Sequence, residues 1–79
     1  MFSYTVSKIA DKKAFLNTCA LIEANLKTIE KEDPLIDVDG SVIQTYHTPE
    51  GTIKVFYDLY VDATYVDSKV NLDHIINIL

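Results

Sequence analysis

Residues Thr52–Val66 read TIKVFYDLYVDATYV, and this stretch decides the fold that the sequence predicts. Its odd-numbered positions are all apolar or aromatic, whereas its even-numbered positions are mostly polar but include the aromatic residues Phe56 and Tyr60. A period of two places alternate side chains on opposite faces of a strand. The stretch therefore predicts one long, half-buried central strand. The alternative is a strand that breaks near Asp62 and folds back to add a fourth strand to the sheet.

Two shorter strands accompany this stretch. Phe2–Ser7 alternates apolar and hydroxyl-bearing residues, and Ser41–Thr48 leads into a turn that contains Pro49 and Gly51. Proline fixes the first turn position and glycine accepts a positive φ, which predicts a tight hairpin with the central strand. The turn residues favour a three-residue loop closed by a bulge, with Thr48 opposite the first residue of the central strand.

The length of this loop decides which side chains the sheet displays. The three-residue loop places Val42 and Tyr46 on the same face as Phe56 and Tyr60, away from the predicted helix. A two-residue loop instead places Val42 and Tyr46 on the face of Tyr57. A shift of one residue in the register therefore moves the side chains of Val42 and Tyr46 from one face of the sheet to the other.

A long helix is predicted from Lys12 to about Lys31, with Asp11 as its N-cap and Pro34 beyond its end. Its apolar residues recur every three or four positions and form one stripe that faces the sheet. The stripe consists of Phe15, Cys19, Ile22, Leu26 and Ile29. The sheet residues expected to be buried beneath it are Ile53, Val55, Tyr57, Leu59 and Val61.

A second, short helix is predicted over Asn71–Leu79, where Leu72, Ile75, Ile76 and Leu79 share one face. The predicted fold class is α+β, with residues 1–79 forming a single domain. A right-handed crossover from the first strand gives a three-stranded antiparallel sheet in the order 2-3-1, or a four-stranded sheet if the long strand folds back. The long helix is expected to pack on one face of this sheet.

The charged residues indicate which classes of molecule the chain can bind. The net charge is −5, and all seven basic residues are lysines. Arginine supplies the fork that reads phosphates and guanine edges, so its absence disfavours direct nucleic-acid binding, as does the negative charge. No apolar run is long enough to span a bilayer, and no signal peptide is recognisable. A cytoplasmic protein that does not bind membranes is expected.

No arrangement in the sequence indicates catalysis. The only cysteine, Cys19, lies on the buried helix stripe, and His47 and His74 belong to different elements. Asp58 and Asp62 share a predicted strand face, but four residues of strand separate their carboxylates by about 13 Å. That separation is too large for the carboxylate pair of a glycosidase. The chain is therefore predicted not to be an enzyme.

Metal and cofactor sites are also not expected. Asp37–Gly40 reads DVDG, but an EF-hand register would place Leu35 at the first ligand position and Tyr46 at the bidentate one. A phosphate-binding loop is not recognisable either, because Gly40 and Gly51 are the only glycines.

A surface for protein partners remains. Under the favoured register, Tyr46, Phe56 and Tyr60 lie exposed beside Asp58 and Asp62, and such aromatic patches are typical of interfaces. A neighbouring segment adds the acidic residues Glu30, Glu32, Asp33, Asp37 and Asp39. We therefore expect a regulator or inhibitor of a basic protein, in which the carboxylates imitate a nucleic-acid backbone. The simpler interpretations are that the C-terminal helix covers the aromatic residues and that the charge serves solubility.

Two other functions compete with this hypothesis. The first is a structural or assembly protein that acts by self-association. The long strand is expected to leave unpaired backbone groups near Tyr60–Val66, which would favour a homodimer formed by edge pairing. A small enzyme that depends on Cys19 ranks last.

Overall fold

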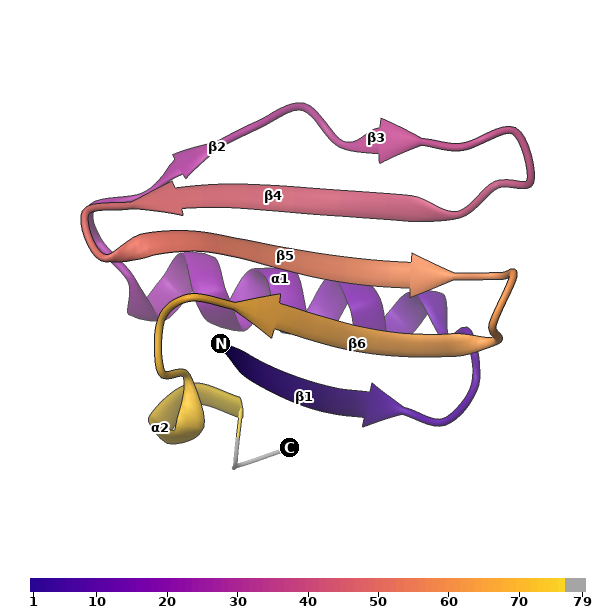
Figure 1. The fold of residues 1–79 in the computed structure, drawn as a ribbon, viewed down its shortest axis with the longest axis horizontal. Coiled ribbons are helices and arrows are strands. Elements are labelled where there is room, and N and C mark those ends of the chain that lie inside the picture. The colour runs from indigo at the N-terminus through magenta and orange to yellow at the C-terminus, as the bar shows by residue number, and fades with distance from the viewer. Residues whose placement is uncertain (77–79) are drawn as a thin grey trace.

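The computed structural model of the chain describes residues 1–76. It contains one long helix, one short helix and six strands (Figure 1). In chain order these are β1 (Phe2–Ser7), α1 (Lys12–Asn25), β2 (Glu30–Lys31), β3 (Leu35–Ile36), β4 (Val42–Thr48), β5 (Gly51–Asp58), β6 (Ala63–Ser68) and α2 (Asp73–Ile76). All strand pairs are antiparallel, in the order β1-β6-β5-β4-β2, and β3 also pairs with β4.

The predicted α+β class, with one long helix and a short C-terminal helix, is confirmed, whereas the three-stranded sheet in the order 2-3-1 is wrong. The additional strands arise at two places. The predicted central strand divides into β5 and β6, and two short strands, β2 and β3, cover the outer edge of β4. Within residues 1–76, no helix is long and apolar enough to cross a membrane.

The long strand breaks at Leu59–Asp62, as the alternative interpretation of this stretch proposed. The Asp58 carboxylate accepts hydrogen bonds from the backbone N–H groups of Tyr60 and Val61, at 3.0 and 3.2 Å. Asp62 adopts a φ of 56°, a left-handed conformation that aspartate tolerates better than most residues. Asp58 consequently pairs with Ala63, and β6 returns beside β5.

The hairpin between β4 and β5 has a two-residue loop, so the favoured three-residue loop is wrong. Thr48 pairs directly with Gly51. The Thr48 hydroxyl accepts hydrogen bonds from the N–H groups of Glu50 and Gly51, both at 3.1 Å, and so satisfies the turn without a bulge. Gly51 is required here, because its φ is 146° and a Cβ atom would lie 2.5 Å from the Cβ of Lys69.

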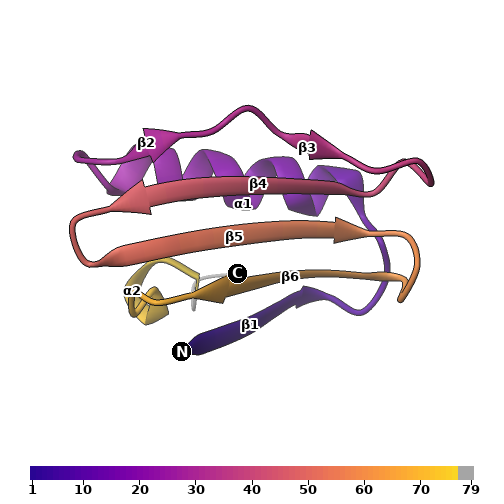
Figure 2. The ribbon, with the colours of Figure 1, turned by 45° about the horizontal axis from the view of Figure 1, so that its top comes forward.

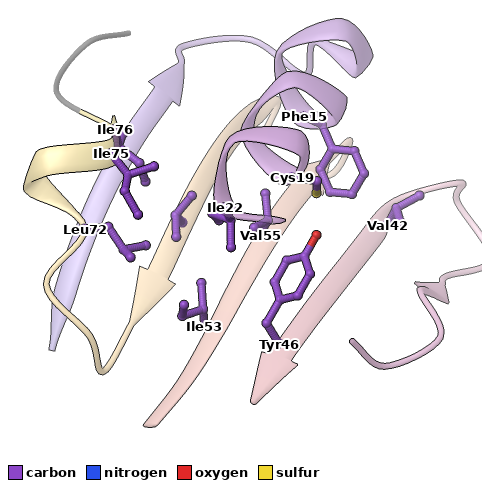
Figure 3. Packing of buried hydrophobic residues seen from close by; sticks show 11 residues of the cluster. Phe15, Cys19, Ile22, Val42, Tyr46, Ile53, Val55, Leu72, Ile75 and Ile76 are labelled. Carbon is purple, nitrogen blue, oxygen red and sulfur yellow. The ribbon is translucent and has the colours of Figure 1, made fainter. Parts of the chain in front are cut away.

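Both helices pack on the same face of the sheet (Figures 2 and 3). Leu72, Ile75 and Ile76 of the C-terminal region join the core that α1 forms with the sheet through Phe15 and Ile22. The C-terminal helix therefore does not cover the other face of the sheet, contrary to one expectation. Leu79, predicted to extend this helix, lies outside the described residues.

The predicted core is confirmed for Ile53 and Val55, which are fully buried beneath Phe15, Cys19 and Ile22. The helix ends at Asn25 and not near Lys31, so Leu26 and Ile29 pack on the margin of the core from irregular backbone. A helix of this length spans roughly 21 Å, about the length of a seven-residue strand. A longer helix would project beyond the sheet.

Leu59 and Val61 are wrongly predicted as core residues. Both lie in the turn after β5, where their side chains are 40% and 57% exposed. Tyr57 is only partly buried, and its ring lies 6.1 Å from that of Phe15.

The start of α1 follows the predicted capping. The Asp11 carboxylate accepts a hydrogen bond from the N–H of Ala14 at 3.1 Å. The buried hydroxyl of Thr64 connects this region to β6, because it accepts from the N–H of Asp11 at 2.9 Å and donates to the carbonyl of Ile9 at 3.0 Å. One threonine thus fixes where the chain leaves β1 and enters α1.

We expect Ile22→Ala to lower the free energy of unfolding by about 2–5 kcal/mol, because it leaves a cavity in the fully buried centre of the core. Leu59→Ala should cost about 1 kcal/mol or less, because that side chain is partly exposed in a turn. Urea unfolding followed by circular dichroism measures both. Equal losses in the two variants would contradict this placement of the core.

Candidate protein-binding face

The face of the sheet turned away from α1 and α2, here called the open face, carries the candidate site. A row of directly paired residues crosses it from one edge to the other. The row consists of Thr5, Tyr65, Phe56, Ile43 and Leu35, contributed by β1, β6, β5, β4 and β3 in turn. Four of these five side chains are apolar or aromatic, so the open face has an apolar band that neither helix covers.

Phe56 and Tyr65 form the centre of this band. Their rings stack with centroids 4.6 Å apart and an angle of 13° between planes. The Tyr65 hydroxyl donates a hydrogen bond to Oδ2 of Asp58 at 2.9 Å. Burial, together with the neighbouring Asp58 carboxylate, raises the pKa of Tyr65 to about 12. The pair is therefore a fixed platform whose polar atom is already satisfied.

Asp58 is held as a carboxylate by three donors. The backbone N–H of Val61 has the largest effect in lowering its pKa, and the Tyr65 hydroxyl and the backbone N–H of Tyr60 act in the same direction. Partial burial opposes this shift but does not overcome it. Asp58 therefore combines two roles, because it closes the turn after β5 and keeps a negative charge beside the aromatic pair.

A depression of about 300 Å³ lies beside this platform, where β4 begins and β5 ends. We call it the acidic pocket. Its lining includes the apolar side chains of Leu35, Ile43 and Phe56. The remaining lining residues are Asp37, Asp39, Ser41, Val42, Tyr57, Asp58 and Tyr60.

The carboxylates of the acidic pocket have no cationic partner within residues 1–76, where the two ion pairs are Lys31–Glu23 and His47–Glu32. Asp37 and Asp39 each use one oxygen locally, accepting from the N–H groups of Val38 at 2.7 Å and Ser41 at 2.9 Å. The whole segment from residue 30 to residue 40 is exposed, as the sequence predicts. The pocket therefore combines apolar surface with uncompensated negative charge.

The structure brings together five of the ten predicted partner-binding residues, since Asp37, Asp39, Phe56, Asp58 and Tyr60 all line the acidic pocket. Others lie elsewhere. Glu30 pairs with His47 across β2 and β4, and the Glu32 carboxylate contacts the His47 ring. Asp33 is exposed in the break between β2 and β3.

Two of the predicted placements are corrected. Tyr46 does not lie on the exposed face but is fully buried beneath α1, because the two-residue loop turns it toward the helix (Figure 3). Asp62 does not share a strand face with Asp58. It lies in the turn, where its carboxylate accepts a hydrogen bond from the N–H of Ala10 at 2.8 Å.

On the helix side, Tyr46 belongs to a polar cluster that joins α1, β4 and β2. Its hydroxyl donates to Oε2 of Glu23 at 2.5 Å, and Nζ of Lys31 lies 3.2 Å from the same oxygen. Burial raises the pKa of the nearby Cys19 thiol, which keeps it protonated and a weak nucleophile. Among residues 1–76, no three His, Cys, Asp or Glu side chains are grouped so that they could hold a metal ion.

Sequence reasoning missed Tyr65, Ile43 and Leu35. Tyr65 lies at an odd position of the long alternating stretch, on the opposite side from Phe56 and Tyr60 if the strand is unbroken. Because Asp58 pairs with Ala63, odd-numbered residues of β5 lie on the same face of the sheet as even-numbered residues of β6. Tyr65 therefore shares a face with Phe56. The aspartates at 58 and 62 were the available signal, because aspartate commonly begins a turn.

Comparison of the chain with models of known protein families found no match. Comparisons with curated proteins and with solved structures likewise found no similar protein. Function is therefore inferred from the open face itself.

Asp58→Asn should reduce the loss of stability on acidification. Because the folded-state pKa of Asp58 is lowered, its ionised form contributes stability that is fully present above the unfolded carboxyl pKa, near about 4. That contribution is lost as the pH falls through the lower, folded pKa. Urea unfolding at a series of pH values from about 7 to about 2 should therefore show a steeper acid loss for the wild-type chain than for the variant.

Asp33→Asn is the matched control, because Asp33 has no hydrogen bond or ion pair in the described part of the chain. It should retain the wild-type pH dependence. If Asp58→Asn also retained it, the three donors would not favour the ionised carboxylate.

Proposed function

We propose that the chain is a non-enzymatic binding module that docks its open face onto a basic protein partner. The observation that carries this proposal is the meeting of the apolar band and the acidic pocket at Phe56 and Asp58. Aromatic side chains contribute large contact areas to interface cores, and carboxylates at the margin select and steer a cationic partner.

The charge of the chain supports a protein partner over a nucleic acid. A net charge of −5 with no arginine repels phosphate and lacks the side chain best suited to bind it. The same carboxylates attract the basic surface of a nucleic-acid-binding protein. We therefore propose that the module acts as a regulator or inhibitor, occupying a surface that would otherwise contact phosphates, and that it does so in the cytoplasm.

Recognition would divide between two parts of the site. The stacked pair Phe56–Tyr65 and the exposed Leu35 would contact apolar side chains of the partner, whereas Asp37 and Asp39 would face its lysines or arginines. Rim charges mainly affect the rate of association and its dependence on salt. A buried aromatic anchor mainly affects the rate of dissociation.

Affinity purification with the tagged chain, followed by mass spectrometry, should recover a basic protein at low ionic strength and lose it at high ionic strength. Asp37→Asn/Asp39→Asn should reduce recovery at least about tenfold, because rim charges that face a cationic surface are removed while the local hydrogen bonds can remain. Leu35→Ala should also weaken recovery without unfolding the chain, because its side chain is 65% exposed.

The control is Glu30→Gln/Glu50→Gln, which removes the same charge at the opposite end of β4 and should leave recovery close to that of the wild type. Recovery of no basic protein would contradict the proposal. So would a basic protein that is retained equally by the wild type, the Asp37/Asp39 variant and the Leu35 variant.

A further inference from the structure

The two edges of the sheet differ in how they are protected from pairing with another strand. The β2–β3 edge consists of two strands of two residues each, interrupted by Glu32, Asp33 and Pro34. Short strands, acidic side chains and proline are the features by which natural edges discourage pairing. This edge is unsuited to accept a further strand.

The β1 edge has none of this protection from charge or proline. Phe2–Ser7 reads FSYTVS and contains neither a charged residue nor a proline. Its inner side pairs with β6, and no strand within residues 1–76 pairs with its outer side. A register shift between Thr5 and Ser7 limits the regular part of the edge to its first four residues. Phe2 remains 38% exposed there.

We propose that β1 pairs with β1 of a second copy of the chain, in antiparallel orientation, to form a homodimer. This contact is independent of the proposed partner-binding role, because it uses the edge and not the acidic pocket. It also differs from the edge predicted from the sequence. Residues near Tyr65 cannot supply an unpaired edge, since β6 is paired with both β1 and β5.

A second copy fits this edge by symmetry. A row of backbone N–H and C=O groups on an antiparallel edge is complementary to itself about a twofold axis perpendicular to the sheet. That axis keeps the helices of both copies on one side and both open faces on the other. Because the core of a chain of this size is small, an added interface contributes usefully to its stability.

The densest group of acidic residues does not oppose this contact, because it lies far from β1. The nearer carboxylates of Asp67 and Asp73 accept hydrogen bonds from the hydroxyls of Ser3 and Tyr4. The segment from Glu30 to Asp39 is at the opposite edge of the sheet, four strand spacings from β1. Edge pairing through β1 would separate the two acidic segments by roughly 40 Å, at about 4.8 Å for each strand. The Debye length at physiological ionic strength is about 8 Å, so their repulsion is screened.

Sedimentation equilibrium over a hundredfold range of concentration tests the proposal. The wild-type chain should shift from the 8.9 kDa monomer toward twice that mass as concentration rises. Ser3→Lys/Thr5→Lys places exposed lysines on the edge, and any twofold antiparallel register within Phe2–Val6 sets like charges opposite each other. This variant should remain at the monomer mass while keeping the wild-type circular dichroism spectrum.

Asn17→Lys/Thr28→Lys is the control, because it adds the same charge at two exposed positions away from β1 and should dimerise as the wild type does. A wild-type chain that stays at 8.9 kDa throughout would overturn the proposal. A lysine edge variant that dimerises normally would overturn it as well.

If the lysine edge variant does not fold, hydrogen exchange of the wild-type chain still decides the question. Amides in Phe2–Thr5 should exchange more slowly at high than at low concentration, whereas those of β2 and β3 should not change. Exchange in β1 that is independent of concentration would contradict the dimer.

Discussion

The turn at Leu59–Asp62 is the constraint on which the rest of the sheet depends. Its hydrogen bonds to the Asp58 carboxylate reverse the chain, so that β6 can pair with β5 on one side and β1 on the other. An extended strand through this region could not place β6 between β5 and β1. The turn also places Tyr65 beside Phe56, because pairing Asp58 with Ala63 exchanges the faces of the two strands.

Much of the fold could be predicted from local patterns, since the residues concerned act through their immediate neighbours. The Asp11 cap, the helix stripe from Phe15 to Ile22 and the burial of Ile53 and Val55 all follow from short-range periodicity. The break in the long stretch could not be predicted securely. Alternation continues through the turn, where the partly exposed Leu59 and Val61 look like core residues. The break depends on hydrogen bonds from backbone N–H groups to the Asp58 carboxylate, and a pattern of apolar and polar residues cannot reveal such bonds.

The candidate site was predictable in composition but not in arrangement. The exposure of the acidic segment from Glu30 to Asp39 follows from its charge, and the structure agrees. The position of Tyr46 depended on one residue of loop length, and Pro49 and Gly51 are compatible with either loop. The Thr48 hydroxyl made the difference by bonding both turn amides, which permits the shorter loop. A hydrogen bond made by one threonine side chain does not change the pattern of apolar and polar residues, so the pattern does not reveal the loop length.

The open face is a consequence of how the chain uses its apolar residues. α1 and α2 both pack on the side of Ile53 and Val55, so within residues 1–76 neither helix covers the band through Phe56 and Tyr65. The Asp58 carboxylate positions the centre of the band, because it accepts hydrogen bonds from the N–H of Tyr60 in the turn and from the Tyr65 hydroxyl. A preformed surface loses less conformational entropy on binding than a mobile one. The carboxylates of Asp37 and Asp39 accept hydrogen bonds from nearby backbone, so the charge of the acidic pocket can change with little effect on the fold. Asp58 differs, because its carboxylate contributes to the charge of the pocket and also holds the turn after β5.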